Sequence, residues 1–256
     1  MITDLETYKE VYDNIVADHE KLRYRIDYYK QKAIKELRNA KTFPAWKWYE
    51  YECPKSRNEY IIYYYADNKK NIDNPRPGCF LTIKIGKGEF IIKWFISGYK
   101  HSNDTPTKAV RQIHAYSTHF LLRYAERFLK NSTLGVIESA CRFLTRNDLF
   151  MPLEITEGIN RNVAKYGEGG KRGFRVRDGM CFAQSWLEGQ FYNDGDKSKD
   201  KVDAIVFVFT TFVPESDMTN EQRLSIDKEH WEKWIRAYMD FTDEATNGEL
   251  TLRLDQ

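Results

Sequence analysis

The chain has 256 residues, of which 41% are apolar and 15% aromatic, and its net charge at neutral pH is +2. A chain of this size and aromatic content can bury a sizeable core, which excludes an intrinsically disordered protein. The longest apolar runs, such as 204–209, are too short to cross a bilayer, and the first residues are acidic with no signal-peptide core. We therefore expect a cytoplasmic protein with no membrane partner.

Four cysteines are scattered along the chain without a CxxC pair. We expect reduced, mostly buried thiols, since close cysteine pairs mark most disulfide frameworks and zinc sites. No cysteine or histidine pair has a convincing ligand spacing, and no phosphate-loop or dinucleotide motif is present. The sequence therefore predicts no metal and no cofactor.

The charge is unevenly distributed. Residues 107–180 carry 13 basic and 7 acidic side chains, whereas residues 181–256 carry 8 and 16. A basic surface suits an anionic partner such as RNA. The alternative is that the acidic part of the chain folds against the basic part. A third interpretation has an acidic C-terminal helix covering a basic groove.

The first elements are helical. A capping-box pattern at 3–6 precedes apolar residues at helical spacing as far as about residue 40, which predicts one long helix or two stacked helices. Phe43-Pro44 ends this region. Four runs rich in aromatic and β-branched residues follow at 46–53, 59–66, 79–85 and 89–97, and they predict an antiparallel meander.

The polar segment 99–107 is the best candidate for a domain boundary. It separates an N-terminal unit, residues 1–106, from an α+β unit, residues 107–256, unless the two merge into one domain. The second unit begins with a short strand at 110–115. Ser117 or Thr118 then caps a helix, and 131–133 caps a second helix at 134–144.

The remaining elements alternate between turns and strands. Residues 150–166 are ambiguous and predicted to be helical in part, and the glycine-rich 167–173 reads as a flexible basic turn. A hairpin joins 174–177 to 180–186 about Asp178-Gly179. The apolar run 202–213 predicts the central strand of a sheet, and a capping box at 219–222 opens a helix to about 241. The fold class predicted for the whole chain is α+β.

The first candidate site lies on the helix that begins near residue 118. His119, Arg123 and Arg127 occupy positions i, i+4 and i+8 and share one face. RNA cleavage without a metal requires proton carriers and cations, which histidine and arginine supply. The alternative is an ordinary amphipathic helix whose arginines are solvated or paired with acids such as Glu126.

Two further groups of residues are candidates for a site. Lys171, Arg172, Arg175 and Arg177 could line a phosphate groove, or they could protect a solvated edge strand by charge. Thr210-Thr211, at the end of the apolar strand, fits a pleated surface better than a substrate contact. Alternating aromatics could offer a stacking face for bases, although core packing is the favoured interpretation: Trp46, Trp48, Tyr49, Tyr51, Tyr63 and Tyr65.

In this order, the elements at 110–213 resemble the RelE and barnase-like toxin ribonuclease superfamily, in particular small domains that begin with a His-x-x-x-Arg-x-x-x-Arg helix. The matching residues are His119, Arg123, Arg127, Arg175, Arg177 and Thr210 or Thr211. The resemblance implies a helical pair packed on an antiparallel sheet and metal-independent RNA cleavage. His119 would then be the proton carrier, and Arg123, Arg127 and Arg175 would bind the phosphate.

The leading hypothesis is thus a metal-independent endoribonuclease or nucleic-acid-processing protein of toxin-like, prokaryotic type, with RNA as partner. The alternative is a non-catalytic binding or structural protein of phage or mobile-element origin, with a protein partner. Exposure separates the two hypotheses. In an enzyme, His119, Arg123 and Arg175 should converge in one open cleft, whereas in the alternative the arginines should diverge or pair with acids.

Overall fold

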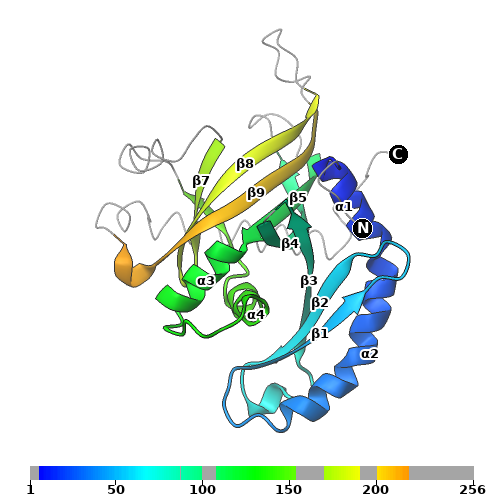
Figure 1. The fold of residues 1–256 in the computed structure, drawn as a ribbon, viewed down its shortest axis with the longest axis vertical. Coiled ribbons are helices and arrows are strands. Elements are labelled where there is room, and N and C mark those ends of the chain that lie inside the picture. The colour runs from blue at the N-terminus through cyan, green and yellow to red at the C-terminus, as the bar shows by residue number, and fades with distance from the viewer. Residues whose placement is uncertain (1–5, 87, 100–107, 154–169, 191–200, 219–256) are drawn as a thin grey trace.

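The computed structural model describes residues 6–86, 88–99, 108–153, 170–190 and 201–218. These residues form an α+β fold, as predicted, with helices on both faces of one sheet (Figure 1). The helices are α1 (Tyr8–Ala17), α2 (His19–Leu37), α3 (Thr118–Arg127) and α4 (Val136–Arg146). The strands are β1 (Ala45–Glu52), β2 (Glu59–Ala66), β3 (Arg76–Ile85), β4 (Gly88–Tyr99), β5 (Lys108–Ser117), β6 (Met151–Leu153), β7 (Gly170–Val176), β8 (Gly179–Gln190) and β9 (Lys201–Pro214).

The sheet has nine strands in the order β1-β2-β3-β4-β5-β9-β8-β7-β6. The predicted meander is confirmed, since β1 to β5 pair successively and antiparallel. β5 then pairs in parallel with β9, which is the sixth of the nine strands, as expected of an almost wholly apolar run. Strands β4 and β5 pair along their length, so the ranges 1–106 and 107–256 share one sheet; residues 100–107 lie outside the described residues.

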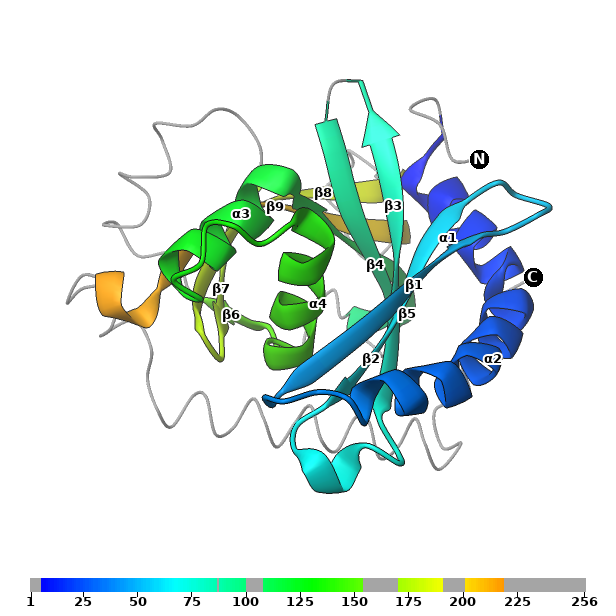
Figure 2. The same ribbon diagram turned by 60° about the horizontal axis from the view of Figure 1, so that its bottom comes forward.

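One face of the sheet is covered by α1 and α2 (Figure 2). Thr7 and Glu10 form a capping box at the start of α1, whereas most of the capping box predicted at 3–6 lies outside the described residues. Of the two predicted alternatives, one long helix or two helices, the structure has two, which are divided at Asp18. This carboxylate is buried and accepts hydrogen bonds from four side chains of the β1–β2 hairpin: Cys53, Ser56, Asn58 and Tyr60.

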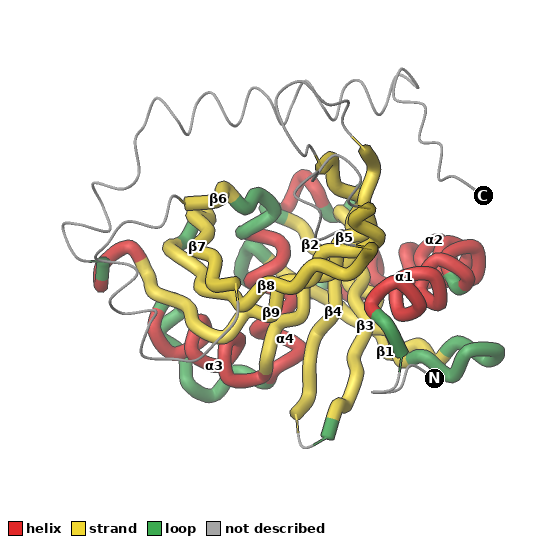
Figure 3. Tube along the Cα trace, turned by 90° about the horizontal axis from the view of Figure 1, so that it is seen from above, coloured by secondary structure: helices red, strands yellow, loops and turns green. Residues whose placement is uncertain are grey.

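The opposite face is covered by α3 and α4, whose aromatic side chains pack against β9. Ser117 caps α3 through a 3.2 Å hydrogen bond from the backbone N–H of Phe120 to its hydroxyl, as predicted. Tyr124 and Phe143 meet Phe212 in the resulting core. Viewed from above, α1 and α2 lie at one end of the molecule and β6 and β7 at the other (Figure 3).

Three predicted elements need correction. The second helix begins at Val136 with Gly135 as N-cap, because the Asn131 side chain is engaged locally by the backbone N–H and hydroxyl of Thr133. Residues 151–153, at the start of the ambiguous segment that was predicted to be helical in part, form β6 because they pair with β7. The predicted basic turn contains the start of β7, since pairing with β8 extends that strand back to Gly170.

The predicted hairpin about Asp178-Gly179 is present, with Arg177 and Asp178 between the two strands. Gly179 is the first residue of β8, and a Cβ atom there would lie only 2.3 Å from the Val213 carbonyl oxygen. The remaining predictions, for 154–169 and for the C-terminal capping box and helix at 219–241, fall outside the described residues. The interpretation in which that helix covers a basic groove falls there too.

Candidate functional site

The helix predicted to carry the catalytic residues is present as α3, and His119 is exposed in its first turn. The two arginines that share a helix face with His119 already have partners. Arg123 Nη1 lies 3.2 Å from Glu126 Oε2, and Arg127 Nη1 donates a 3.2 Å hydrogen bond to the Phe212 carbonyl oxygen. Arg123 thus follows the amphipathic-helix alternative, whereas Arg127 binds a backbone carbonyl and not an acid.

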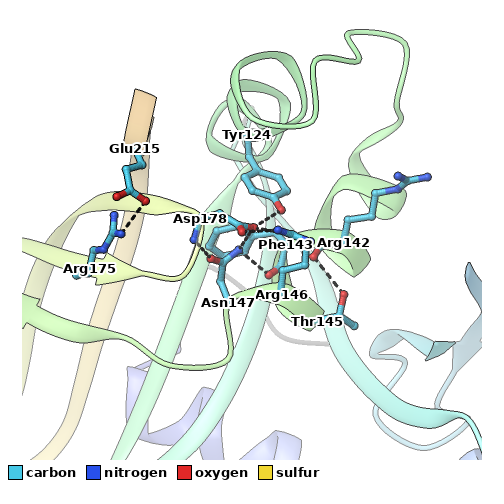
Figure 4. Close-up of polar contacts among 9 residues, drawn as sticks. All are labelled: Tyr124, Arg142, Phe143, Thr145, Arg146, Asn147, Arg175, Asp178 and Glu215. Atoms are coloured by element: carbon cyan, nitrogen blue, oxygen red, sulfur yellow. Dashed lines mark hydrogen bonds and ion pairs between the residues drawn. The ribbon is translucent and has the colours of Figure 1, made fainter. Parts of the chain in front are cut away.

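The predicted phosphate groove on β7 does not face α3. Phe174 and Val176 point into the core beneath α3 and α4. Because side chains alternate across a strand, Arg175 points to the other face, where it lies 3.8 Å from Met218 Sδ. Its guanidinium also forms a 3.0 Å ion pair with Glu215, away from α3 (Figure 4). His119 and Arg175 are thus separated by the sheet, and the expected cleft joining His119, Arg123 and Arg175 is not formed.

The other candidates contribute little to a common site. Arg172 and Arg177 are exposed, and the Lys171 side chain lies outside the described residues. The Thr210 hydroxyl donates a 3.5 Å hydrogen bond to the Phe182 carbonyl oxygen, which fits its predicted structural role.

A buried polar cluster that the sequence did not reveal centres on Asp178 (Figure 4). Its carboxylate accepts hydrogen bonds from Tyr124, Arg146 and Asn147 at 2.7–3.0 Å, and its backbone N–H donates to Asn147 Oδ1. Burial, then the Asp178 carboxylate, raises the pKa of Tyr124 well above its ordinary value. The cluster joins α3, α4 and the β7–β8 turn, so we interpret it as structural.

A second buried group lies on the central strands. His114 is enclosed by aromatic rings, and its ring nitrogens contact Gln112 and the Tyr116 hydroxyl. Burial, with a smaller contribution from the Lys93 ammonium, lowers the pKa of His114 to about 3. This imidazole is therefore neutral near pH 7. It is buried among aromatic side chains, away from solvent, and we assign it to the core.

The alternating aromatics of β1 divide between two faces. Tyr49 lies beneath α2 and stacks on Tyr29, with ring centroids 4.6 Å apart. Trp46 and Trp48 point to the face that α4 covers, opposite Tyr65 and Tyr63 of β2. The two predicted interpretations, core packing and a stacking face for bases, thus apply to different residues. Tyr63 is buried core, whereas Trp48 keeps 37% of its surface exposed.

Trp46 is held by α4. Its indole N–H donates a 3.1 Å hydrogen bond to the Thr145 hydroxyl, and the Arg142 guanidinium lies 4.7 Å from the ring centroid. Arg142 is in turn held by Glu138, one turn earlier on the helix, with an N–O distance of 2.5 Å. Figure 4 shows Arg142 pointing away from the Asp178 cluster. A cation is therefore fixed beside an indole at the edge of the sheet.

Both tryptophans line a pocket of about 260 Å³, which we call the Trp46–Trp48 pocket. It lies where the C-terminal end of α2 and the segment leading to β1 approach α4. Its basic members are Lys41, Lys47 and Arg142, and its acidic members are Glu36 and Glu138. Lys47 lies 3.8 Å from Glu36. The remaining lining residues are Asn39, Ala40, Thr42, Pro44 and Ala45.

The pocket combines flat aromatic surface with cations, which can stack a nucleobase and contact its phosphate. A similar pairing occurs nearby on β2 and β3, where the Arg76 guanidinium lies 4.8 Å from the Tyr65 ring centroid. Arg76 is also ion-paired with Asp67. The sequence signal for this site is the aromatic alternation at 46–65, but Arg142, which completes it, is distant in sequence.

Within the described ranges, no cluster of three or more histidine, cysteine or acidic side chains could hold a metal. The four cysteines are free thiols, and Cys53, Cys141 and Cys181 are buried as expected, whereas Cys79 is half-buried. None of the helices in the described part of the chain has the length and apolar character needed to span a membrane.

Comparisons of the chain with protein-family models, with curated proteins and with solved structures found no match.

Proposed function

We propose that this protein binds single-stranded nucleic acid, with RNA as the expected ligand, and holds it without cleaving it. The observation that carries the proposal is the Trp46–Trp48 pocket, which is lined by the partly exposed Trp48 and by Lys41, Lys47 and Arg142. Stacking of a base on an aromatic side chain contributes about 1–3 kcal/mol and tolerates any sequence. One or two such contacts, with cations at the phosphates, suffice for measurable binding.

The basic residues are placed to support this role. Arg142 is held on Trp46 by its ion pair with Glu138, so little side-chain freedom is lost when a phosphate approaches. Lys41 and Lys47 also line the pocket, and Lys47 is ion-paired with Glu36. Glu36 and Glu138 are ion-paired with Lys47 and Arg142, so a phosphate that binds here competes with these carboxylates for the two cations.

The catalytic alternative has weaker support. Arg123 is paired with Glu126, and Arg175 lies across the sheet from His119. Among the described residues that line the Trp46–Trp48 pocket, none is a histidine. Cleavage by His119 remains a prediction that rests on its exposure at the first turn of α3.

The test is fluorescence anisotropy with a labelled RNA oligonucleotide of about 12 nucleotides, in EDTA. The variants are Trp48→Ala and, as a matched control, Trp186→Ala, because both indoles are 37% exposed and lie on different strands. We expect Trp48→Ala to weaken binding about five-fold or more and Trp186→Ala to leave it unchanged. Equal affinities for the two variants, or no binding by the wild type, would overturn the proposal.

A further inference from the structure

The outer surface of α2 carries a regular stripe of basic and tyrosine side chains. Lys21, Tyr24, Tyr28, Lys32 and Lys35 recur at intervals of three or four residues and are all exposed. Residues at these intervals share one face of a helix. The opposite face of α2 is buried through Leu22, Ala33 and Leu37. We call the exposed set the α2 stripe.

The two tyrosines of the α2 stripe are unusual for their exposure. Tyr24 is 67% and Tyr28 61% exposed. The Arg25 guanidinium lies 5.9 Å and 5.6 Å from their ring centroids and 5.2 Å from that of Tyr51. Arg25 therefore lies within cation–π range of both exposed rings and of Tyr51 on β1.

The α2 stripe leads to the Trp46–Trp48 pocket. Lys32 lies 4.8 Å from the Tyr49 ring centroid on β1, so the stripe follows the edge of the sheet. One turn after Lys35, Asn39 lines the pocket, as does Glu36. At 1.5 Å per residue, the α2 stripe from Lys21 to Lys35 is about 21 Å long.

We propose that the single strand bound in the Trp46–Trp48 pocket continues along the α2 stripe, with bases on Tyr28 and Tyr24 and phosphates at Lys21, Lys32 and Lys35. This inference rests on the proposed function. At about 3.4 Å per stacked nucleotide, the stripe spans roughly six nucleotides. The α2 stripe is thus the part of the site that makes the affinity increase with oligonucleotide length, whereas the pocket holds one or two bases.

The charge of the α2 stripe supports a polyanion. The stripe contains three lysines, and α2 as a whole carries six basic and three acidic side chains, of which the exposed Glu20 and Asp27 border the stripe one turn from Tyr24. Lys32 lies 4.0 Å from Glu36 at the pocket end, an exposed ion pair that a phosphate can replace at little cost. Tyrosines interleaved with lysines offer π-faces for bases between cations for phosphates, which is the pattern of sequence-tolerant single-strand binding.

The experiment is an affinity series over oligonucleotides of about 2, 4, 6, 8 and 12 nucleotides, in RNA and DNA arms. It compares the wild type with Trp48→Ala, Tyr24→Ala/Tyr28→Ala and Tyr24→Phe/Tyr28→Phe. The phenylalanine pair keeps both rings and is the matched control. We expect wild-type affinity to rise with length up to about 6–8 nucleotides and the phenylalanine pair to follow it.

The alanine pair should bind the shortest oligonucleotides like the wild type and lose about five-fold or more at eight nucleotides. Trp48→Ala should weaken binding at every length. If the alanine pair follows the wild type at every length while Trp48→Ala is weakened, this inference is wrong and the proposed function stands. If neither variant differs from the wild type, the proposed function fails as well. The RNA and DNA arms decide whether the 2′-hydroxyl contributes.

Discussion

Arg146 and Asp178 form a bidentate ion pair in which Nε and Nη2 of the guanidinium lie 2.8 Å and 2.7 Å from the two carboxylate oxygens. Asp178 is buried, whereas the Arg146 side chain is one-third exposed. The pair fastens the C-terminal end of α4 to the β7–β8 turn. Because Tyr124 donates to the same carboxylate, α3 is fastened there too.

Removal of this carboxylate should destabilise the fold. We expect Asp178→Ala to lower the free energy of unfolding by about 3 kcal/mol, since it leaves a guanidinium and a buried hydroxyl without their partner. Tyr124→Phe should cost about 1.5 kcal/mol, because it removes only one hydrogen bond to a charged acceptor. Urea denaturation measures both, with the exposed Asp217→Ala as control. Losses equal to that of the control would show that the cluster is not structural.

Asp18 should make stability depend on pH in the acid range. Burial favours the protonated acid, but hydrogen bonds from Ser56, Cys53, Tyr60 and Asn58 outweigh it and lower the pKa of Asp18 in the folded state. As the pH falls, the unfolded chain therefore protonates Asp18 before the folded chain does. The stabilisation that Asp18 contributes is present above about pH 4 and is lost as the pH falls through the pKa of Asp18 in the folded state.

Asp18→Asn tests this expectation. It should cost roughly 1–3 kcal/mol at pH 7, because the amide cannot accept from all four donors. Below pH 4, the free energy of unfolding of the variant should also decrease less than that of the wild type. An unchanged decline would assign the acid sensitivity to other carboxylates. Exposed Asp73→Asn, in which the Arg38 partner is also exposed, controls for loss of a surface charge.

His114 should contribute a second pH dependence with a different window. Its folded pKa of about 3 lies below the ordinary value of about 6.5, so the unfolded state binds a proton that the folded state excludes. Above pH 6.5 the His114 imidazole is neutral in both the folded and the unfolded state, so it does not make the free energy of unfolding depend on pH. Below pH 6.5, stability should fall by up to about 1.4 kcal/mol per pH unit.

Unfolding free energies between pH 7 and pH 5 measure this slope. We expect His114→Leu to be less stable at pH 7, because Gln112 and Tyr116 lose a partner, but to have a shallower slope. His119→Gln, at an exposed site, controls for removal of an imidazole from the surface. A slope that His114→Leu leaves intact would contradict the assignment.

Arg142 should contribute both a phosphate contact and support for Trp46. Arg142→Gln should weaken binding of the RNA oligonucleotide and reduce the slope of log affinity against log salt by about 0.7, the value for one phosphate contact on a single strand. Arg142→Lys should keep the salt slope, since it keeps the charge. If Arg142→Gln changes affinity without changing the slope, Arg142 supports Trp46 but does not contact a phosphate.

RNA incubated with the wild-type protein in EDTA should remain intact. Cleavage that His119→Ala abolishes, in a variant of matched thermal stability, would contradict non-catalytic binding and support the ribonuclease hypothesis. Cleavage that the variant retains would point to a contaminant or to another residue. The thermal match is achievable because His119 is exposed and its removal leaves the core unchanged.

The fold class and most elements could be predicted from the sequence because they depend on local patterns. The strand at 59–66 and the cap at Ser117 follow from side-chain period and capping chemistry within a few residues. The predicted start of α4 was too early because the Asn131 side chain could cap either the helix or its own turn. In the structure it accepts a hydrogen bond from the Thr133 backbone N–H within the turn. Strand β7 was missed in part because its pairing partners, not its glycines, set its length.

The candidate site depended on relationships that no local pattern contains. The aromatic alternation at 46–65 was visible, but only the positions of α2 and α4 decide which rings are buried, as with Tyr63, and which are exposed, as with Trp48. Arg142 reaches Trp46 across 96 positions of sequence, and Asp178 reaches Arg146 across 32. The sequence by itself determined most of the helices and strands that the structure describes. Tertiary packing alone decided that His119 and Arg175 lie on opposite faces of one sheet, because α3 covers the face to which Phe174 and Val176 point and Arg175 alternates to the other.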